Sequence, residues 1–492
     1  MRYAIQDART VEQILRQRAE AFPEEPLFLY WDEGRTRLIS VSARSFFSLT
    51  EKTGAWMLRQ GWQGKRLAIV GENSLSWIAV FFSVVRAGAT AVLLDRNLPV
   101  SEQAALLSRH DCSALFCSSS SYDRFCEELP ALPCFRLDEL PQLSEADCPE
   151  SFRALRELCV QPDDPALIAF TSGTSGKSKG VVLTHDNVAS DIICCARSLQ
   201  VNGTALLVLP LHHMFGMLCL LGSMAWGRTI FINQSLRYIP QDVASGQPLF
   251  VTAVPAMLPL LFRAYQQAQI KEPVKIIVGG APVDEEWKNR FRSLNVCLYS
   301  GYGMTECAPT IAFESELFDC ENGQLQVLDV NEVQIDRPQP DGVGEILVRG
   351  RNVFSGYYGL EEETAAALQD GWLHTGDLGR LDAHGHLSIV GRKKNLLVLA
   401  NGENISSEAI EQKVCSAGKA AECVAFVQDG LLAVEIYAPG QSREDVQNAV
   451  MRLNHSLAST GRIMKILFRE TEFPKNTSGK IIRNAERRPD HV

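Results

Sequence analysis

The sequence predicts a large α/β protein with doubly wound parallel sheets in its N-terminal domain, a small β-rich module, and a small mobile α+β C-terminal domain. The chain has 492 residues, more than a single hydrophobic core usually supports. Short apolar runs alternate with helical patterns through most of its length. From about residue 343, glycines interrupt short β runs such as GEILVRG and GHLSIVGR, and this predicts a different kind of module.

The alternation is clearest between residues 65 and 116. There, KRLAIV, TAVLLD and SALFCS read as buried strands, with the helical patterns SLSWIAVFFSVVRAG and LPVSEQAALLSRHD between them. ALIAF, TALLVLP, PLFVTAVP and VKIIVGG continue the pattern further along the chain. Crossover helices of this kind join parallel strands, and ligands of such sheets bind at the carboxyl ends of the strands.

We expect three parts along the chain. Residues 1–391 form the core domain, with the β-rich module at about 343–391. A hinge at 392–394 follows, and residues 395–492 form a compact C-terminal domain of roughly 100 residues. SSEAIEQKVCSAG and SREDVQNAVMRLNHSLAS are its expected helices, with a strand pair between them.

Composition limits the function classes. The net charge of −10 argues against an extended nucleic-acid surface, which needs a basic stripe. The fourteen cysteines form no CxxC pair, and the N-terminus lacks a secretory pattern, so we expect a cytoplasmic protein with reduced, often buried thiols. The apolar stretch 209–227 contains two histidines and precedes Arg228, which favours a buried helix over an integral membrane segment.

The strongest motif is LIAFTSGTSGKSKGVVLTHDN, at residues 167–187. A strand runs into a loop of ten residues rich in Gly, Ser, Thr and Lys, whose backbone N–H groups, hydroxyls and ammonium groups suit a polyphosphate. The glycine-to-lysine spacing is too short for a Walker A motif, and a β-branched run follows where such a motif would open a helix. The loop therefore predicts phosphate binding outside the P-loop class.

This motif and those below resemble, in order, the adenylate-forming superfamily of acyl-CoA synthetases, peptide-synthetase adenylation domains and luciferases. GVGEILVRGRNVFSGYYG, at 342–359, is most similar to the fatty acyl-CoA synthetase branch. The resemblance implies ATP and Mg²⁺ as cofactors and coenzyme A as acceptor substrate. It places the following residues around the β- and γ-phosphates: Thr171, Ser172, Gly173, Thr174 and Lys179. Ser178 stands where the family commonly has proline.

Three further motifs carry the rest of the core site by resemblance: LPLHHMFGM, IIVGGAP and YSGYGMTEC. Gly279, Gly280 and Ala281 flank the adenine, on which Tyr302 packs. Thr305 contacts the α-phosphate and Glu306 ligates Mg²⁺, a hard cation that prefers oxygen ligands. A lone glutamate at a helix start is ordinarily a solvated carboxylate, and only the intact YGMTE motif favours the metal role.

Two motifs lie further along the chain. In WLHTGD and the following GRKKN, the resemblance assigns Asp377 to the ribose hydroxyls, Arg392 to ribose or phosphate, and Lys394 to the hinge. Asn395 replaces a common aspartate of the family. In PKNTSGK, Lys480 is the lysine that bridges the acyl carboxylate and the α-phosphate.

The resemblance implies that a carboxylic acid is activated to acyl-AMP with release of pyrophosphate and then transferred to coenzyme A. The pocket candidates are, by family position, His213, Val254, Gly279, Gly301, Met304 and Thr310. Because Gly279 and Gly301 are small and the segment TAVPAML is apolar, a medium- or long-chain fatty acid is expected rather than a charged amino acid.

Three alternatives stay open. One is a stand-alone acyl-AMP ligase that loads the phosphopantetheine thiol of a carrier protein acting in trans. Another is a non-catalytic adenylate- or acyl-CoA-binding module, which would be expected to have lost Lys480, Glu306 or Asp377. The third is a light-emitting relative. The segment 323–336 departs from the family pattern without explanation.

Overall fold

A computed structural model describes residues 4–140, 149–172, 178–199, 201–281, 283–314, 323–398, 404–418, 420–428, 431–455, 457, 462–475 and 481. The chain divides into two compact units. The first comprises residues 1–333 and 348–373, and the second comprises residues 334–347 and 374–492.

The first unit contains a sheet with the strand order β18-β8-β7-β4-β3-β5-β6. Its strands are β3 (Arg66–Val70), β4 (Thr90–Leu94), β5 (Cys112–Cys117), β6 (Cys134–Arg136), β7 (Pro165–Ser172), β8 (Ser178–Thr184) and β18 (Gly356–Tyr357). β3, β4, β5, β6 and β7 run parallel, whereas β8 returns antiparallel to β7, and β18 pairs antiparallel to β8. The three strands KRLAIV, TAVLLD and SALFCS are thus confirmed as β3, β4 and β5.

A second set of strands in this unit follows the order β15-β14-β13-β12-β11-β9-β10-β1-β2. Their bounds are β1 (Pro26–Trp31), β2 (Leu38–Ser42), β9 (Ala205–Leu207), β10 (Ile230–Ile232), β11 (Phe250–Ala253), β12 (Val274–Val278), β13 (Val296–Gly303), β14 (Thr310–Phe313) and β15 (Leu325–Val327). The strands from β1 to β13 through β10, β9, β11 and β12 are parallel, and β2 and β14 are antiparallel to their neighbours.

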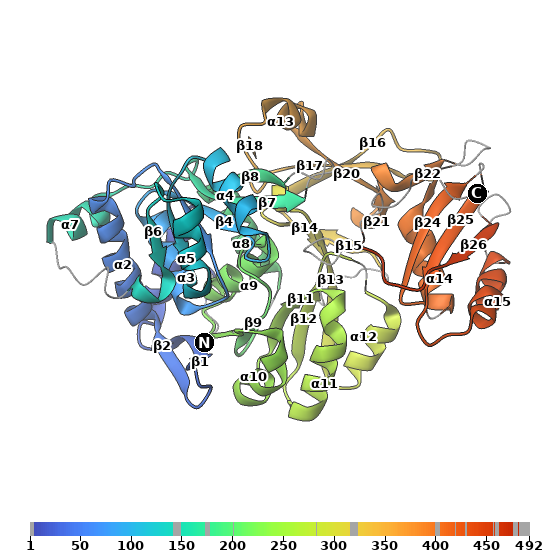
Figure 1. Ribbon diagram of the computed structural model, residues 1–492, viewed down its shortest axis with the longest axis horizontal. Helices are drawn as coiled ribbons and strands as arrows, with labels where there is room; N and C mark the ends of the chain where they lie inside the picture. The colour runs from blue at the N-terminus through green and yellow to red at the C-terminus, as the bar shows by residue number, and fades with distance from the viewer. Residues whose placement is uncertain are drawn as a thin grey trace. The chain divides into compact units, whose positions relative to one another are not determined.

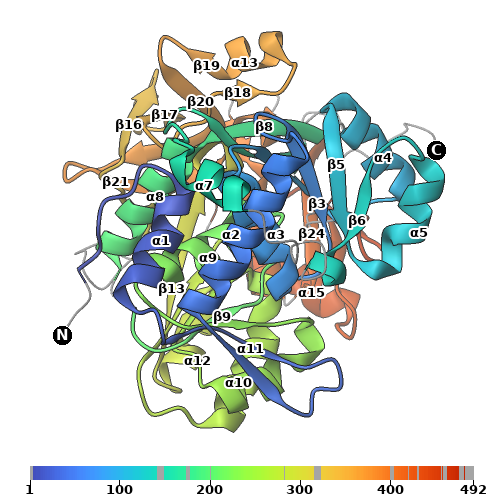
Figure 2. The same ribbon diagram turned by 90° about the vertical axis from the view of Figure 1, so that its left-hand side faces the viewer.

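Helices fill the space between these sheets and cover their outer faces. They are α1 (Val11–Ala21), α2 (Ala43–Arg59), α3 (Leu75–Arg86), α4 (Val100–Arg109), α5 (Ser119–Glu128), α7 (Pro149–Glu157), α8 (His185–Ser198), α9 (Met214–Ala225), α10 (Ile239–Gly246), α11 (Leu258–Ala268), α12 (Glu285–Arg292) and α13 (Glu361–Ala367). α8 contacts β7 and β8, α9 contacts β9 and β11, and the two helices contact each other. Figure 2 shows α1 beside this pair.

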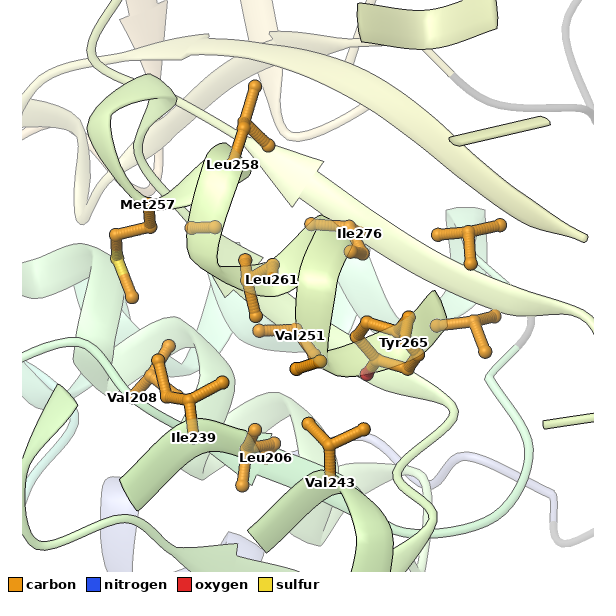
Figure 3. Close-up of a cluster of buried hydrophobic side chains, with 14 of the residues drawn as sticks. Leu206, Val208, Ile239, Val243, Val251, Met257, Leu258, Leu261, Tyr265 and Ile276 are labelled. Atoms are coloured by element: carbon orange, nitrogen blue, oxygen red, sulfur yellow. The ribbon is translucent and has the colours of Figure 1, made fainter. Parts of the chain in front are cut away.

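Buried apolar side chains hold the second set of strands to its helices. Val251 and Ile276 of β11 and β12 meet Leu261 and Tyr265 of α11 and Val243 of α10 (Figure 3). Each of these side chains is at least nine-tenths buried, so each contributes a transfer free energy of about 1.5–3 kcal/mol. This core places the carboxyl ends of β11, β12 and β13 at a common edge.

The second unit carries a three-stranded sheet of β24 (Glu422–Gln428), β25 (Leu431–Tyr437) and β26 (Lys465–Phe468). Helices α14 (Ser407–Gly418) and α15 (Arg443–Asn454) pack beside it (Figure 1). The unit also holds β21 (His386–Arg392), β22 (Leu396–Val398) and β23 (Asn404–Ser406), most of β20 (Trp372–Leu381), and parts of β16 (Asn331–Asp336) and β17 (Gly344–Gly350). The short β19 (Leu368–Gln369) pairs with the first residues of β20 within the first unit.

The compact units divide at 373/374, within β20, and this division by packing does not test the predicted boundary of a mobile domain at 391. The physical reason is that β21 pairs antiparallel with β20 and also contacts β23 and α14, so these strands share more surface with the C-terminal residues. A hinge at 392–394 stays a prediction, since a division by packing does not show where a pivot lies. The α/β fold class itself is confirmed.

The apolar stretch 209–227 contains α9, a helix of 12 residues with nearly every side chain buried. The expectation of a buried helix is confirmed. Within the described ranges, no helix combines the length and the apolar character that crossing a bilayer requires. The atypical segment 323–336 contains β15 and β16, and the side-chain amide of Asn331, the first residue of β16, donates to the carbonyl of Thr310 (3.0 Å).

Candidate nucleotide and acyl-transfer site

The predicted phosphate loop is the tip of a β-hairpin. β7 and β8 pair through Thr171 opposite Lys179 and Ser172 opposite Ser178, so the strands take up half of the expected ten-residue loop. Gly173 and Thr174 lie outside the described residues. The hairpin explains why β-branched residues follow the glycines, because the returning chain continues as a strand.

Gly180 shows how tightly this hairpin is seated. A Cβ atom at this position would lie 2.5 Å from Nε2 of His110 and 3.0 Å from the Ile168 side chain. His110 is buried, and its Nδ1 lies 2.8 Å from the Leu106 carbonyl oxygen, so the ring has little room to move. Burial also lowers the pKa of His110. A side chain larger than hydrogen would therefore displace the base of the phosphate hairpin.

Glu306 lies on a short 3-10 helix, η4 (Thr305–Cys307), that follows β13. The turn before it needs a glycine, because a Cβ atom on Gly303 would lie 2.0 Å from the Pro309 carbonyl oxygen. The Glu306 side chain is buried, and its Oε1 accepts a hydrogen bond of 2.8 Å from the hydroxyl of Tyr357. Its backbone carbonyl accepts the Phe354 N–H (2.8 Å).

A buried carboxylate behind the turn holds it in place. Asp191 of α8 is fully buried, and its Oδ1 accepts hydrogen bonds from the Thr310 backbone N–H and the Asn352 side-chain amide, both at 3.2 Å. The same amide donates to the carbonyls of Cys307 (3.0 Å) and Thr310 (2.9 Å). Burial raises the pKa of Asp191 to about 8, and hydrogen bonds from Asn352 and Thr310 oppose this only in part.

One turn earlier on α8, the Asn187 side chain binds the backbone on either side of Asn352. Its side-chain amide donates to the carbonyls of Arg351 (2.7 Å) and Val353 (2.9 Å). Asn187 also closes the capping box with Thr184 at the start of the helix. Sequence reasoning missed Asn187, Asp191 and Asn352. The available signal was the spacing of Asn187 and Asp191, four residues apart and therefore on one face of the helix.

The residues around Glu306 fit a magnesium ion bound together with phosphates. No cluster of three potential metal ligands occurs among the described residues, so any protein ligand of the ion in this region would be Glu306 alone or with one other group. Mg²⁺ is commonly held by one or two carboxylates plus waters and substrate phosphates, so a single buried carboxylate suits it. Lys179 of the hairpin lies with its Nζ 4.8 Å from the centre of the Tyr357 ring, the ring whose hydroxyl binds Glu306.

The expected adenine and acyl positions meet at the carboxyl ends of three parallel strands. Val254 follows β11, Gly279 and Gly280 follow β12, and Tyr302 lies near the end of β13. The Val254 side chain lies 3.9 Å from where a Cβ of Gly280 would stand, and the Gly279 N–H donates to the Ala253 carbonyl (3.1 Å). Ala281 is exposed just beyond them. The structure thus brings these candidates together at one edge, as parallel topology requires.

Phe215 is an aromatic residue of this region that the sequence did not single out. A Cβ atom on Gly279 would lie 3.0 Å from its ring. Gly301, another pocket candidate, would place a Cβ atom 3.4 Å from the Ile277 side chain. Phe215 is partly buried and packs against the same core as Val254. The signal for it was its place two residues after His213, in the first turn of a helix.

His213 is the N-cap residue of α9, and its carbonyl accepts the N–H groups of Gly216 (2.9 Å) and Met217 (3.2 Å). Its ring lies 4.1 Å, centre to centre, from that of His212. Burial, and then the neighbouring His213, lower the pKa of His212 to about 3. Asn73 fixes the preceding loop, because its side chain donates to the Leu209 carbonyl (2.8 Å) and accepts the Leu211 N–H (3.1 Å).

The remaining pocket candidates have structural partners of their own. The Met304 N–H donates to the Pro309 carbonyl (2.9 Å), which ties it to the turn that carries Glu306. Thr310 is buried and held through its backbone by Asp191 and Asn352. Both residues therefore lie beside the predicted metal ligand.

In the second unit, Asp377 and Arg392 face each other across β20 and β21. Arg392 Nε lies 2.9 Å from Asp377 Oδ1, with the aspartate buried and the arginine exposed. The buried Glu345, which sequence reasoning missed, accepts hydrogen bonds from Lys393 Nζ (2.8 Å) and the Gly376 N–H (3.1 Å). Burial tends to raise the pKa of Glu345, but its hydrogen bonds, first that of Lys393, outweigh this and lower it.

The hinge and the terminal lysine are less fully described. Lys394 is exposed on the 3-10 helix η5 (Lys393–Asn395), and the Asn395 amide donates to Glu408. Lys480 lies outside the described residues. The residues on either side of that segment, Lys475 and Ile481, form an antiparallel bridge.

Comparisons with known proteins agree with this geometry. The AMP-binding enzyme family matches residues 15–358. A feruloyl-CoA synthase from Amycolatopsis sp is 29% identical over 449 residues, which cover 86% of this chain and 89% of that protein. Two structures of o-succinylbenzoate coenzyme A synthetase from Bacillus subtilis, one with the acyl-adenylate intermediate OSB-AMP and one with ATP and magnesium ion, are 26% identical, with TM-scores of 0.82 and 0.81.

These two structures cover 96% of this chain and 97% and 98% of their own chains. A fatty acyl CoA synthetase from Mycobacterium tuberculosis has a TM-score of 0.73 at 23% identity, covers 96% of this chain and 97% of its own, and so supports the fold alone. The family match covers well over half of the residues and includes the phosphate hairpin, the β11–β13 edge and the Glu306 turn. The chain belongs to the AMP-binding enzyme family, as its motifs indicate.

Proposed function

We propose that this AMP-binding enzyme is an ATP-dependent acid–CoA ligase. A carboxylate oxygen attacks the α-phosphorus of MgATP, the bond to the β-phosphate oxygen breaks, and pyrophosphate leaves with the bonding electrons. The sulfur of coenzyme A then attacks the acyl carbonyl carbon, AMP leaves, and the thiol proton passes to solvent. The carboxylic acid is ionised at neutral pH and needs no general base for the first step.

The observation that carries the proposal is the meeting of Lys179 and Glu306 at Tyr357. One residue supplies a cation from a glycine-rich hairpin, and the other supplies a buried carboxylate, so a polyphosphate and its metal could be held side by side. A bound magnesium ion would neutralise charge on the leaving pyrophosphate. Lys179, Thr171 and the hairpin backbone would bind the β- and γ-phosphates, and Thr305 the α-phosphate.

The residues of the second unit take the roles that the resemblance gives them. Asp377, paired with Arg392, would accept hydrogen bonds from the ribose hydroxyls. Lys480 would bridge the acyl carboxylate and the α-phosphate, where a fixed ammonium stabilises the charge of the displacement. Lys394 would be the pivot about which the C-terminal domain moves between the two half-reactions.

We infer that the acid substrate has an apolar acyl group. An aromatic acid is favoured over the medium- or long-chain fatty acid that the sequence alone favours. None of the described pocket positions apart from His213 carries a titratable side chain. Phe215 presents a ring next to Gly279, where a flat acyl group could lie against it. The feruloyl-CoA synthase and o-succinylbenzoate coenzyme A synthetase relatives also point to aromatic acids.

A pyrophosphate-release screen over aryl, fatty and amino acids tests the proposal, with and without coenzyme A. We expect release with at least one aromatic acid and faster turnover when coenzyme A is added. Release with fatty acids alone would reject the aromatic preference but keep the ligase. No release with any acid from folded, magnesium-supplied protein would reject the function. Discharge of the adenylate only by a phosphopantetheinylated carrier protein would instead support the carrier-loading alternative.

A further inference from the structure

Tyr357 contacts both Glu306 and Lys179, the carboxylate and the ammonium group of the proposed nucleotide site. Its sequence motif did not predict these contacts. Its hydroxyl donates to Oε1 of Glu306 at 2.8 Å, and its ring faces the Lys179 ammonium at 4.8 Å. We propose that Tyr357 is a positioning residue that aligns Glu306 for magnesium and Lys179 for the phosphates. The inference rests on the proposed function and adds a residue to its site.

The hydrogen bond has a clear consequence for a metal ligand. A carboxylate that is free to rotate presents either oxygen or both. When one oxygen is held by a hydroxyl, the other is left in a defined direction. Hydrogen bonds of this kind orient metal ligands, and their loss typically costs about 10–100-fold in metal affinity or activity.

The contact with the Tyr357 ring restrains the Lys179 side chain. The negative face of an aromatic ring attracts an ammonium group, and the attraction is stronger where water is partly excluded; both Lys179 and Tyr357 are partly buried. Lysine is otherwise a flexible side chain with several rotamers. The Tyr357 ring thus favours the rotamers in which the Lys179 ammonium lies over the ring whose hydroxyl binds Glu306.

Tyr357 can position its neighbours only if it is itself fixed, and its backbone is held on three sides. It pairs with Val181 in the β18–β8 ladder. Its N–H donates to Thr364 Oγ1 at 2.9 Å, and the next residue's N–H donates to the Gly180 carbonyl at 2.8 Å. The Phe354 N–H, three residues earlier, binds the Glu306 carbonyl. Tyrosine and glutamate are therefore anchored to each other through the backbone as well as through their side chains.

The chain offers a matched control in the next residue. Tyr358 also donates a hydrogen bond to a carboxylate, Asp111 Oδ2, at 2.9 Å, and its ring also lies against a cation, Arg66. Neither partner belongs to the nucleotide site. Tyr357→Phe and Tyr358→Phe thus each remove a hydroxyl that donates to a carboxylate, the second in a more exposed place, and only the first should affect magnesium.

The test is ATP binding measured by titration calorimetry on the full chain, with magnesium and in excess chelator. In Tyr357→Phe we expect the factor by which magnesium increases the ATP affinity to fall by about tenfold. The ATP affinity measured in chelator should stay within about twofold of that of the unchanged protein. Tyr357→Leu, which also removes the ring, should in addition weaken ATP binding in chelator by about two- to fivefold. Tyr358→Phe should change neither affinity.

A double-mutant cycle separates positioning from general damage. In a Glu306→Gln background, Tyr357→Phe should have no further effect on the magnesium gain, because the residue acts through that carboxylate. An undiminished magnesium gain in Tyr357→Phe would overturn the inference, as would equal losses in Tyr357→Phe and Tyr358→Phe. Both results leave the ligase proposal standing. An unchanged protein that shows no magnesium-dependent ATP binding would overturn the inference and the proposed function together.

Discussion

The buried side chain of Asp191 predicts how the free energy of unfolding changes with pH, in both direction and size. Its side chain is fully buried, and burial raises the pKa to about 8, from an ordinary value of 3.8. The folded protein thus holds this group protonated over a range in which the unfolded chain has released the proton. Stability from this group is therefore complete below about pH 4 and is lost as the pH rises toward 8.

The magnitude follows from the width of that window. Each pH unit between the two pKa values costs about 1.4 kcal/mol, so Asp191 should lower the free energy of unfolding by up to about 4 kcal/mol between pH 4 and pH 7. Asp191→Asn keeps the oxygen that accepts the Thr310 and Asn352 N–H groups and cannot ionise. Asp191→Ala removes that oxygen and leaves the Thr310 N–H unsatisfied, at a cost of about 1–3 kcal/mol at every pH.

The assay is urea unfolding followed by tryptophan fluorescence at intervals from about pH 4 to about pH 8. All seven tryptophans lie in the first unit, so the signal reports on the unit that contains Asp191. Other carboxylates contribute to both proteins and cancel in the difference. The stability of Asp191→Asn minus that of the unchanged protein should therefore rise steadily with pH. A difference that stays flat across this range would refute the assignment of a buried, protonated carboxyl.

Three further predictions address other parts of the chain. Lys480→Ala should abolish acid-dependent ATP–pyrophosphate exchange yet leave transfer from supplied acyl-AMP nearly intact; equal loss of both would contradict its role. Lys394→Pro should spare adenylation and slow thioester formation, measured by single-turnover kinetics, and an unaffected second step would remove the hinge assignment. Gly180→Ala should lower the free energy of unfolding by about 1–3 kcal/mol, because its Cβ would meet the His110 ring at 2.5 Å. His110→Ala should recover part of that loss, and no recovery would argue against the clash.

The sequence predicted the parts of the site that lie at the ends of strands. Gly279 and Tyr302 follow apolar runs, and neighbouring parallel strands end at one edge, so their proximity follows from periodicity and topology. The hairpin of Thr171 and Lys179 was visible as a glycine-rich interruption between two such runs. The length of its strand pairing was underestimated, because polar residues continue the backbone pairing after the apolar pattern has ended.

The contacts that fix Glu306 could not be predicted in the same way. Asp191 and Asn352 are 161 positions apart, and no local pattern states that a buried carboxyl on one helix will meet an amide in a distant loop. The division into compact units has the same cause. β20 and β21 resemble the β-rich module in their sequence pattern, yet β21 packs on α14, and only the packing decides to which unit they belong.

α8 connects these observations into one physical argument. The helix begins directly after β8, the returning strand of the phosphate hairpin, and its Asn187 and Asp191 hold the loop and the turn that frame Tyr357 and Glu306. Its own buried side chains anchor it between two sheets. The places of Lys179 and Glu306 are therefore set by a continuous path of backbone and buried hydrogen bonds, and a change in either would cost several of them at once. If the two proposed half-reactions need different arrangements of charge, these contacts favour a proposal in which Lys179 and Glu306 keep their places and the proposed cation Lys480 is the one that moves.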